Sequence, residues 1–349
     1  MSRFLPILVL GVAISVVPGC GEPPATADPR PPATADDRRP IALGIAGDRF
    51  TIDGAPGFLI FVSYFDALPR AAAAGGVDAD FAYLEGKVQG VRIFPNWWGE
   101  PCAPLRTGPD TLIDVDGNIQ PDAWRTLQSV LDRAAAHHLV VDLSLTRETV
   151  TDNGSPARVL SFDAYARAVT TLIGSADYMK GKYPHVLIDV QNEWPRFADA
   201  KDVEALLTGL RAADPQRILA ASSSGGPYQP IGLAVPNMVA AYHDPREKDW
   251  FTLDAATRVV NGVRATLGGA VQPIYLQEPA PASARCGRAD HDTDPAHFRD
   301  AMNHAREAGA AAWTFHSRLG FSLRDRSLTQ QLEDAANAPE KTFFDRLLK

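Results

Sequence analysis

Eight short, almost continuously apolar runs recur along the chain after residue 40, separated by longer stretches of mixed character. They are rich in β-branched and aromatic residues, and polar positions do not alternate with apolar ones inside them. Such runs are typical of strands buried on both faces, as in a parallel sheet. The runs span Phe58–Phe65, Val88–Pro95, Leu139–Leu145, Val186–Val190, Ile218–Ala221, Met238–Tyr242, Pro273–Leu276 and Ala310–Phe315.

Between these runs, apolar residues recur at helical spacing, and several segments carry helix start or stop signals. Ser161 and the pair Asp294-Pro295 are typical of helix starts, and Gly268-Gly269 is a stop signal. The stretches Ala67–Gly86 and Gly225–Pro236 contain Gly and Pro and are expected to hold only short helices. The predicted helices are Asp122–His138, Phe162–Tyr178, Asp199–Ala213, Thr252–Leu267, Asp294–Ala308 and Leu328–Leu348.

Eight strands that alternate with helices predict an α/β fold, a (β/α)8 TIM barrel that forms one domain over residues 41–349. A shorter strand before the barrel is expected to turn at Asp53-Gly54. An open, doubly wound sheet is the alternative architecture. It is disfavoured because no G-x-G-x-x-G sequence follows the first strand and no Walker-type phosphate loop occurs.

The first 40 residues differ from the rest of the chain. Arg3 and the apolar stretch Leu5–Val17 predict a signal peptide over residues 1–19, and Gly19-Cys20 resembles a bacterial lipoprotein processing site. Lipidation of Cys20 would anchor the protein in the cell envelope, in the periplasm or at the cell surface. Plain secretion is the alternative. Residues 20–40 repeat Pro, Ala, Thr and Asp and predict a disordered tether.

Composition and charge limit the partners that this chain can have. The 349 residues are 45% hydrophobic and 22% charged, which is ordinary for a globular protein. A net charge of -8 argues against nucleic acid and against anionic lipid surfaces. Membrane contact is therefore expected only through the lipid anchor, and the protein is expected to be a monomer. If Cys20 is acylated, Cys102 and Cys286 remain as an even pair that an oxidising compartment permits to form a disulfide.

Polar groups and tryptophans stand where the predicted strands end, which is where TIM barrels carry their chemistry. Two of them are glutamates on different strands, and a pair of carboxylates is the minimum equipment for cutting a glycosidic bond. The residues at these ends are Arg92, Trp97 and Trp98 after the second strand, Asn192, Glu193 and Trp194 after the fourth, Tyr242 and His243 at the sixth, Glu278 after the seventh, and Trp313 in the eighth.

This set of residues resembles the clan A glycoside hydrolases, most closely the cellulase-like family 5. The resemblance covers residues 45–349 and is carried, in chain order, by Arg92, Asn192-Glu193, His243, Glu278 and Trp313. It implies retaining hydrolysis of β-linked O-glycosidic bonds in a poly- or oligosaccharide by double displacement. Glu278 would be the nucleophile, kept ionised by Arg92. Glu193 would be the acid/base, with a pKa raised by the neighbouring carboxylate and by burial beside Trp194.

The resemblance also implies roles in substrate binding. Asn192 would donate a hydrogen bond to the sugar 2-hydroxyl, and His243 and Tyr242 would hold the nucleophile or touch the sugar. The tryptophans would offer flat apolar faces to the sugar rings, with Trp313 as the floor of the subsite. The substrate-binding tryptophans would be Trp97, Trp98, Trp194 and Trp313. No cofactor and no metal are expected.

Two departures from the family pattern leave parts of the site open. The histidine that family 5 has after its third strand is replaced here by the region of Ser144 and Thr146. The tyrosine that should touch the nucleophile is Tyr242, Tyr275 or absent. Two other functions use the same barrel: a transglycosylase, and a non-catalytic carbohydrate-binding lipoprotein. A metal-dependent amidohydrolase is disfavoured because the first strand lacks His-x-His.

Overall fold

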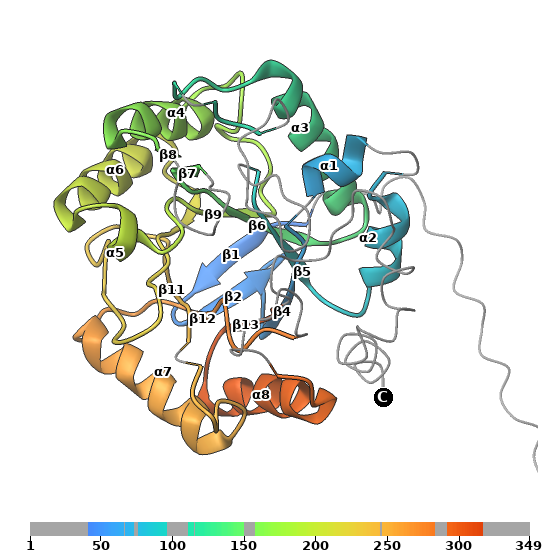
Figure 1. Cartoon of the computed structure of the whole chain (residues 1–349), viewed down its shortest axis with the longest axis vertical. Coiled ribbons are helices and arrows are strands. Elements are labelled where there is room, and N and C mark those ends of the chain that lie inside the picture. Colours follow the sequence, from blue (N-terminus) through green and yellow to red (C-terminus); the bar gives the residue numbers. More distant parts are fainter. Residues whose placement is uncertain are drawn as a thin grey trace, which may run out of the picture. The chain divides into compact units, whose positions relative to one another are not determined.

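Eight parallel strands form a closed barrel, in a computed structural model that describes residues 41–65, 67–72, 76–95, 111–114, 116–149, 158–244, 246–282 and 292–316 (Figure 1). All eight apolar runs lie in this barrel, so the predicted TIM-barrel fold is confirmed. Each strand pairs with its neighbour in chain order, and the last pairs with the first. The strands are β4 (Leu59–Ser63), β5 (Gly90–Ile93), β6 (Val140–Ser144), β9 (Val186–Asp189), β10 (Ile218–Ala220), β11 (Met238–Tyr242), β12 (Ile274–Leu276) and β13 (Ala312–Phe315).

Helices surround the barrel on the outside, as Figure 1 shows. The predicted N-caps are present, since the side chain of Ser161 accepts from the Ala164 N–H and that of Asp294 from the Ala296 N–H. Residues 225–236 contain turns and no helix, and Leu328–Leu348 lies outside the described residues. The helices are α1 (Ala67–Ala72), α2 (Asp78–Leu84), α3 (Pro121–Ala136), α4 (Phe162–Gly174), α5 (Trp194–Phe197), α6 (Ala200–Ala213), α7 (Leu253–Leu267) and α8 (Pro295–Ala308).

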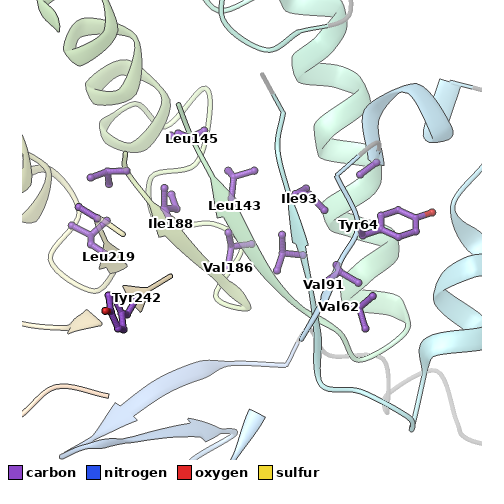
Figure 2. Close-up of a cluster of buried hydrophobic side chains, with 14 of the residues drawn as sticks. Val62, Tyr64, Val91, Ile93, Leu143, Leu145, Val186, Ile188, Leu219 and Tyr242 are labelled. Atoms are coloured by element: carbon purple, nitrogen blue, oxygen red, sulfur yellow. The ribbon is translucent and has the colours of Figure 1, made fainter. Parts of the chain in front are cut away.

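Side chains alternate along each barrel strand between the helix layer and the barrel axis, because a strand has a period of two. The outward positions form one apolar cluster between strands and helices, part of which is drawn in Figure 2. This cluster, here called the outer layer, supplies most of the apolar burial of the fold. It includes Val62, Tyr64, Val91, Ile93, Leu143, Ile188, Leu219 and Tyr242.

The inward positions near the N-terminal ends of the strands are also apolar, and an antiparallel sheet closes that end. This sheet consists of β1 (Leu43–Ala46), β2 (Arg49–Ile52) and β3 (Ala55–Gly57), with the predicted turn at Asp53-Gly54. In Figure 1, β1 and β2 cross the middle of the barrel. Phe50 of β2 is fully buried in the same cluster as the inward Phe61 of β4. This end, here called the floor of the barrel, is therefore apolar.

The inward positions near the C-terminal ends of the strands are polar instead. Several that lie on the strands or within two residues of their ends are fully buried, and these come from seven of the eight strands. They are Ser63, Arg92, Asp142, Ser144, Asp189, Ser222, Gln277 and Thr314. Buried polar groups need partners, so this end of the barrel is where a functional site is expected. Among the described residues, no helix is long and apolar enough to cross a membrane.

Candidate active site

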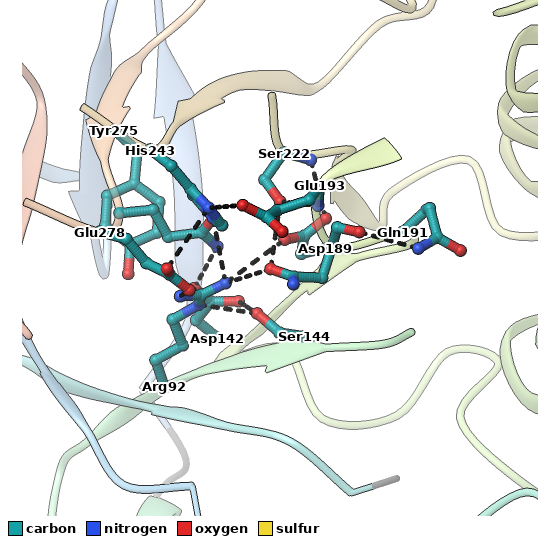
Figure 3. Close-up of polar contacts among 12 residues, drawn as sticks. Arg92, Asp142, Ser144, Asp189, Gln191, Glu193, Ser222, His243, Tyr275 and Glu278 are labelled. Atoms are coloured by element: carbon teal, nitrogen blue, oxygen red, sulfur yellow. Dashed lines mark hydrogen bonds and ion pairs between the residues drawn. The ribbon is translucent and has the colours of Figure 1, made fainter. Parts of the chain in front are cut away.

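Arg92 is the hub of the polar end of the barrel (Figure 3). Its side chain points inward from β5 and has no exposed surface. Its Nε donates to Ser144 Oγ at 2.9 Å, and its Nη2 donates to Asn192 Oδ1 at 2.7 Å. Its Nη1 donates to Glu278 Oε1 at 2.5 Å. One guanidinium thus ties together the ends of β5, β6, β9 and β12.

Two buried aspartates lie close to Arg92 and offset its positive charge. Asp142 Oδ2 lies 3.4 Å from Nε, and Asp189 Oδ2 lies 3.9 Å from Nη2. Burial raises the pKa of Asp142 to about 6, although Arg92 opposes the rise. Burial alone would lower the pKa of Arg92, but the negative charges of Glu278 and Asp142 outweigh it, so this pKa is raised. The guanidinium therefore stays charged.

His243 joins the two predicted catalytic carboxylates. Its Nδ1 lies 3.4 Å from Glu193 Oε1 and 3.4 Å from Glu278 Oε2. These two oxygens are therefore less than about 7 Å apart, whereas retaining glycosidases hold their carboxyl groups about 5–5.5 Å apart and inverting ones about 6.5–9.5 Å. His243 Nε2 lies 3.3 Å from Gln277 Oε1, which fixes the ring from behind. This upper bound is compatible with the retaining spacing.

Glu278 lies among basic side chains. Besides Arg92 and His243, Oε2 lies 3.5 Å from Arg246 Nη2 and 3.9 Å from His316 Nε2. Burial alone would raise the pKa of Glu278, but His243 and Arg92 outweigh it and hold this pKa well below its usual range. Glu278 is therefore a carboxylate at neutral pH, as the sequence predicted.

Glu193 reaches the mouth of the barrel through an unusual backbone conformation. Its φ is 49° and its ψ is 47°, in the left-handed region. Its N–H donates to Ser222 Oγ at 3.0 Å, which holds this turn against β10. The extended strand ends here, so Asn192 and Glu193 both face the barrel mouth although they are consecutive.

The expectation that the pKa of Glu193 is raised was wrong for the protein without substrate. Burial does raise this pKa, but the hydrogen bond and the charge of His243 lower it. Glu278 raises it again, and Arg196, whose Nη1 donates to Glu193 Oε2, lowers it. The net pKa lies below the ordinary value of a glutamate. The expectation of a raised pKa rests on burial and the second carboxylate and leaves out the two basic partners, His243 and Arg196.

Tyr242 and Trp313 do not face the mouth, contrary to the prediction. Both belong to the outer layer, with 3% and 1% of their surface exposed. The Tyr242 hydroxyl donates to the Gly226 carbonyl, and both rings line a cavity of about 470 Å³ beneath α7. The reason is the strand period. His243 after β11 and Thr314 in β13 take the inward positions, so their neighbours point outward. Trp194 also packs in the outer layer.

His316 is a residue of the site that the sequence argument did not select. It follows β13, is 3% exposed, and its Nδ1 lies 3.1 Å from Ser63 Oγ. Burial lowers the pKa of His316 to about 3, so the ring is neutral at pH 7. Counting inward positions from Thr314 would have identified it. Arg196 and Arg246 follow no strand directly and carried no such signal.

The two open questions about the family pattern have structural answers. In the region where the resemblance implies a histidine, Ser144 of β6 accepts a hydrogen bond from Arg92. Tyr275 points into the barrel and its hydroxyl pairs with Thr314 Oγ1 at 2.7 Å. The other oxygen of Glu278, Oε2, lies near Arg246, His243 and His316. Among the described contacts, neither Tyr242 nor Tyr275 touches it.

Several predicted residues lie outside the described part of the chain. They are Cys20, Trp97, Trp98, Cys102 and Cys286. The stacking role of the two tryptophans, the lipidation and the disulfide therefore stay predictions. Within the described residues, no group of three or more His, Cys, Asp and Glu side chains is arranged to hold a metal ion.

Solved structures share this barrel. A provisionally assigned glycoside hydrolase from Bacteroides vulgatus aligns over 89% of this chain with a TM-score of 0.61 and 12% identity, and the chain spans only 61% of its length. An endo-1,4-beta-mannanase from Rhizomucor miehei aligns over 88% of this chain and 99% of its own, with a TM-score of 0.57 and 12% identity.

A beta-glucanase from Saccharophagus degradans, solved with cellotetraose, aligns over 92% of this chain and 97% of its own, with a TM-score of 0.57 and 11% identity. No protein-family model and no curated protein matches the sequence. At these identities the likeness shows the fold: the chain is a (β/α)8 barrel of the kind that glycoside hydrolases of family 5 also use.

Proposed function

We propose that the protein is a retaining glycoside hydrolase that cleaves β-linked O-glycosidic bonds in a poly- or oligosaccharide. The observation that carries the proposal is the arrangement of Glu193 and Glu278. Both carboxylates come from the C-terminal ends of barrel strands and lie 3.4 Å from one imidazole nitrogen. Arg92 holds one of them and the asparagine that precedes the other. The barrel likeness to glycosidases supports the same assignment.

The reaction would proceed in two displacements. Glu278, the ionised carboxylate, attacks the anomeric carbon while Glu193 gives its proton to the departing glycosidic oxygen. A bond forms between Glu278 and the sugar, and the bond to the leaving group breaks. Glu193 then takes a proton from water, and the resulting hydroxide attacks the same carbon and releases Glu278. The anomeric configuration is thereby retained.

Asn192 and Arg92 position the substrate and the nucleophile. Asn192 accepts from Arg92 through Oδ1, so its Nδ2 is the group that remains to donate to the sugar 2-hydroxyl. Arg92 stabilises the negative charge of Glu278 before attack and again when Glu278 leaves. Both contacts are made within the protein before substrate binds, which is the pre-organisation that catalysis requires.

The assignment is tested with aryl β-glycosides of several sugars, whose good leaving groups need little acid catalysis. Glu278→Ala is expected to lose at least about 10³-fold in kcat, since no nucleophile remains. Added azide should restore turnover and give a glycosyl azide of inverted configuration. Glu193→Ala should instead give, with azide, a product of retained configuration.

Three outcomes would contradict the proposal. Full activity of both variants would exclude the two glutamates from the reaction. Binding of glycans without any turnover by the wild-type protein would favour the non-catalytic alternative. Products longer than the substrate without any hydrolysis product would show transfer to a sugar instead of water. The first glycans to test are β-mannan and β-glucan, because similar structures include a mannanase and a glucanase.

A further inference from the structure

Arg196 stands beside the proposed acid/base in an unusual position for an arginine. It lies in α5, three residues after Glu193, and its Nη1 donates to Glu193 Oε2. Its side chain is 57% exposed, while that of Glu193 is 19% exposed. The guanidinium therefore reaches the catalytic carboxyl from the solvent side. Within the described contacts, Glu193 is the carboxylate that Arg196 binds.

This contact conflicts with the proton that Glu193 must carry. A general acid has to be protonated before the glycosidic bond breaks. A positive charge at hydrogen-bond distance favours the ionised form, and a neutral carboxyl no longer balances an arginine. When Glu193 takes up its proton, Arg196 is left beside the departing sugar without the anion that it binds in the free protein.

A groove continues outward from Arg196. It has a volume of about 400 Å³, and its charged lining residues are Arg147, Arg196, Asp199 and Asp202. Burial lowers the pKa of Arg147, and Tyr165, Asp199 and Asp202 oppose this fall electrostatically, so the negative charges of the two groove aspartates act on the second arginine of the groove. The other arginine of the groove, Arg196, binds the catalytic carboxylate of Glu193. Arg196 lines this groove and also contacts Glu193, so it connects the groove to the proposed acid/base.

We propose that the substrate carries a negatively charged group, a carboxylate or a sulfate, on the leaving-group side of the scissile bond and that Arg196 binds it. A planar guanidinium is well suited to both groups, since it donates two parallel hydrogen bonds. Arg196 would turn from Glu193 to the substrate and free Glu193 to hold its proton. This inference rests on the proposed glycosidase function and names its substrate class.

Arg246 does not offer the same opportunity. It lies 3.5 Å from Glu278 Oε2, on the other carboxylate, and a nucleophile stays ionised through substrate binding. Its carboxylate partner is therefore retained when Glu193 is protonated. Glu193 is the carboxylate that has to become neutral. The negative charge of the substrate is therefore expected on the leaving-group side of the scissile bond, next to Glu193.

The test compares two aryl β-glycosides of one sugar that differ at the para position of the leaving group, a carboxylate in one and a carboxamide in the other. Full-length protein with Arg196→Gln is expected to lower the ratio of kcat/KM for carboxylate over carboxamide at least about tenfold, the effect of one charged pair. A second pair, sulfonate and sulfonamide, separates a carboxylate preference from a general anion preference.

Arg125→Gln is the matched control. Arg125 forms the same kind of pair with Asp122, three residues away on the exposed surface of α3, and is 68% exposed. This variant should leave the ratio unchanged.

The pH profile of kcat/KM on a neutral alkyl β-glycoside, whose poor leaving group needs acid catalysis, gives a readout that a structural defect would not produce. The groups that face Glu193 are His243, Glu278, Arg196 and the Ser222 hydroxyl. Removal of the Arg196 charge raises the pKa of Glu193. Activity is lost as pH rises through this pKa, so the basic limb should move to higher pH in Arg196→Gln.

Two results in Arg196→Gln would contradict the role of Arg196 and leave the proposed glycosidase function intact. One is an unchanged ratio of kcat/KM for carboxylate over carboxamide. The other is an equal loss of kcat/KM on both glycosides with no shift of the basic limb. Absence of turnover on every glycoside with the wild-type protein would overturn the proposed function and this inference with it.

Discussion

At the scale of single residues, Glu278 shows how neighbours decide the state of a carboxylate. A buried glutamate alone has a raised pKa. Here Arg92, His243 and Arg246 reverse that effect. The sequence indicated Glu193, Glu278, Arg92 and His243 because each stands at a strand end. The pKa of Glu193 could not be derived in the same way, since it depends on the rotamer of Arg196 and on an imidazole from another strand.

The contact between Arg246 and Glu278 gives a prediction for the acid limb of the pH profile. Glu278 must be ionised to attack, so kcat/KM falls as pH drops through its pKa. Arg246→Gln removes a positive charge, raises this pKa, and should move the acid limb of kcat/KM to higher pH. The plateau should fall less than about tenfold, because Arg246 is partly exposed and Arg92 remains. An unmoved limb would show that Arg246 does not act on Glu278.

At the scale of the elements, the two-residue period of the strands decides which side chains face the mouth of the barrel. The eight strands were predictable because each is a distinct apolar run. Which side chains face the mouth was harder, since one residue of uncertainty at a strand end exchanges inward for outward positions. Trp313 and Tyr242 are predicted at the mouth because aromatic rings suit sugar binding, but both side chains pack outward. His316 is not among the predicted site residues, although its side chain faces inward.

Trp313 and His316 should therefore fail in different ways when they are truncated. Trp313→Ala is expected to lower the free energy of unfolding by about 3–5 kcal/mol, since a buried ring is lost from the outer layer. Below the unfolding transition its kcat/KM should change less than about twofold. Denaturant titration and kinetics on the same preparation measure both quantities.

His316→Ala should show the reverse pattern. The loss of a group 3.9 Å from Glu278 Oε2 is expected to lower kcat/KM about tenfold, less than the removal of a direct oxyanion donor. The free energy of unfolding should fall only about 1–2 kcal/mol, the cost of an unpaired Ser63 hydroxyl. A large kinetic defect in Trp313→Ala with normal stability would contradict the outward placement.

At the scale of the whole molecule, the barrel separates stability from chemistry. The floor is apolar and covered by the β1–β3 sheet, while the mouth is polar and organised around Arg92. Periodicity predicted this fold because closed α/β barrels need continuous apolar strands. The signal peptide stays a prediction of a different kind, since signal peptides are recognised by charge and apolar length instead of packing.

The predicted signal peptide leads to an expectation about where the protein resides. Wild-type protein expressed in a bacterium is expected to be exported and to carry lipid on Cys20, as the sequence pattern indicates. Cys20→Ala should move the protein from the detergent phase to the aqueous phase in a Triton partition. Mass spectrometry of the N-terminal peptide identifies the modification. Equal partition of both proteins would support plain secretion instead.

The left-handed backbone of Glu193 has a consequence for how this protein can be improved. A residue with a Cβ atom at φ 49° costs about 1–2 kcal/mol relative to a relaxed backbone, and glycine would avoid most of it. The chain keeps a glutamate there because glycine has no carboxyl group. Selection for thermal robustness and selection for turnover thus oppose each other at this one position. Thermostable variants should gain their stability in the floor and the helix layer and leave residue 193 strained.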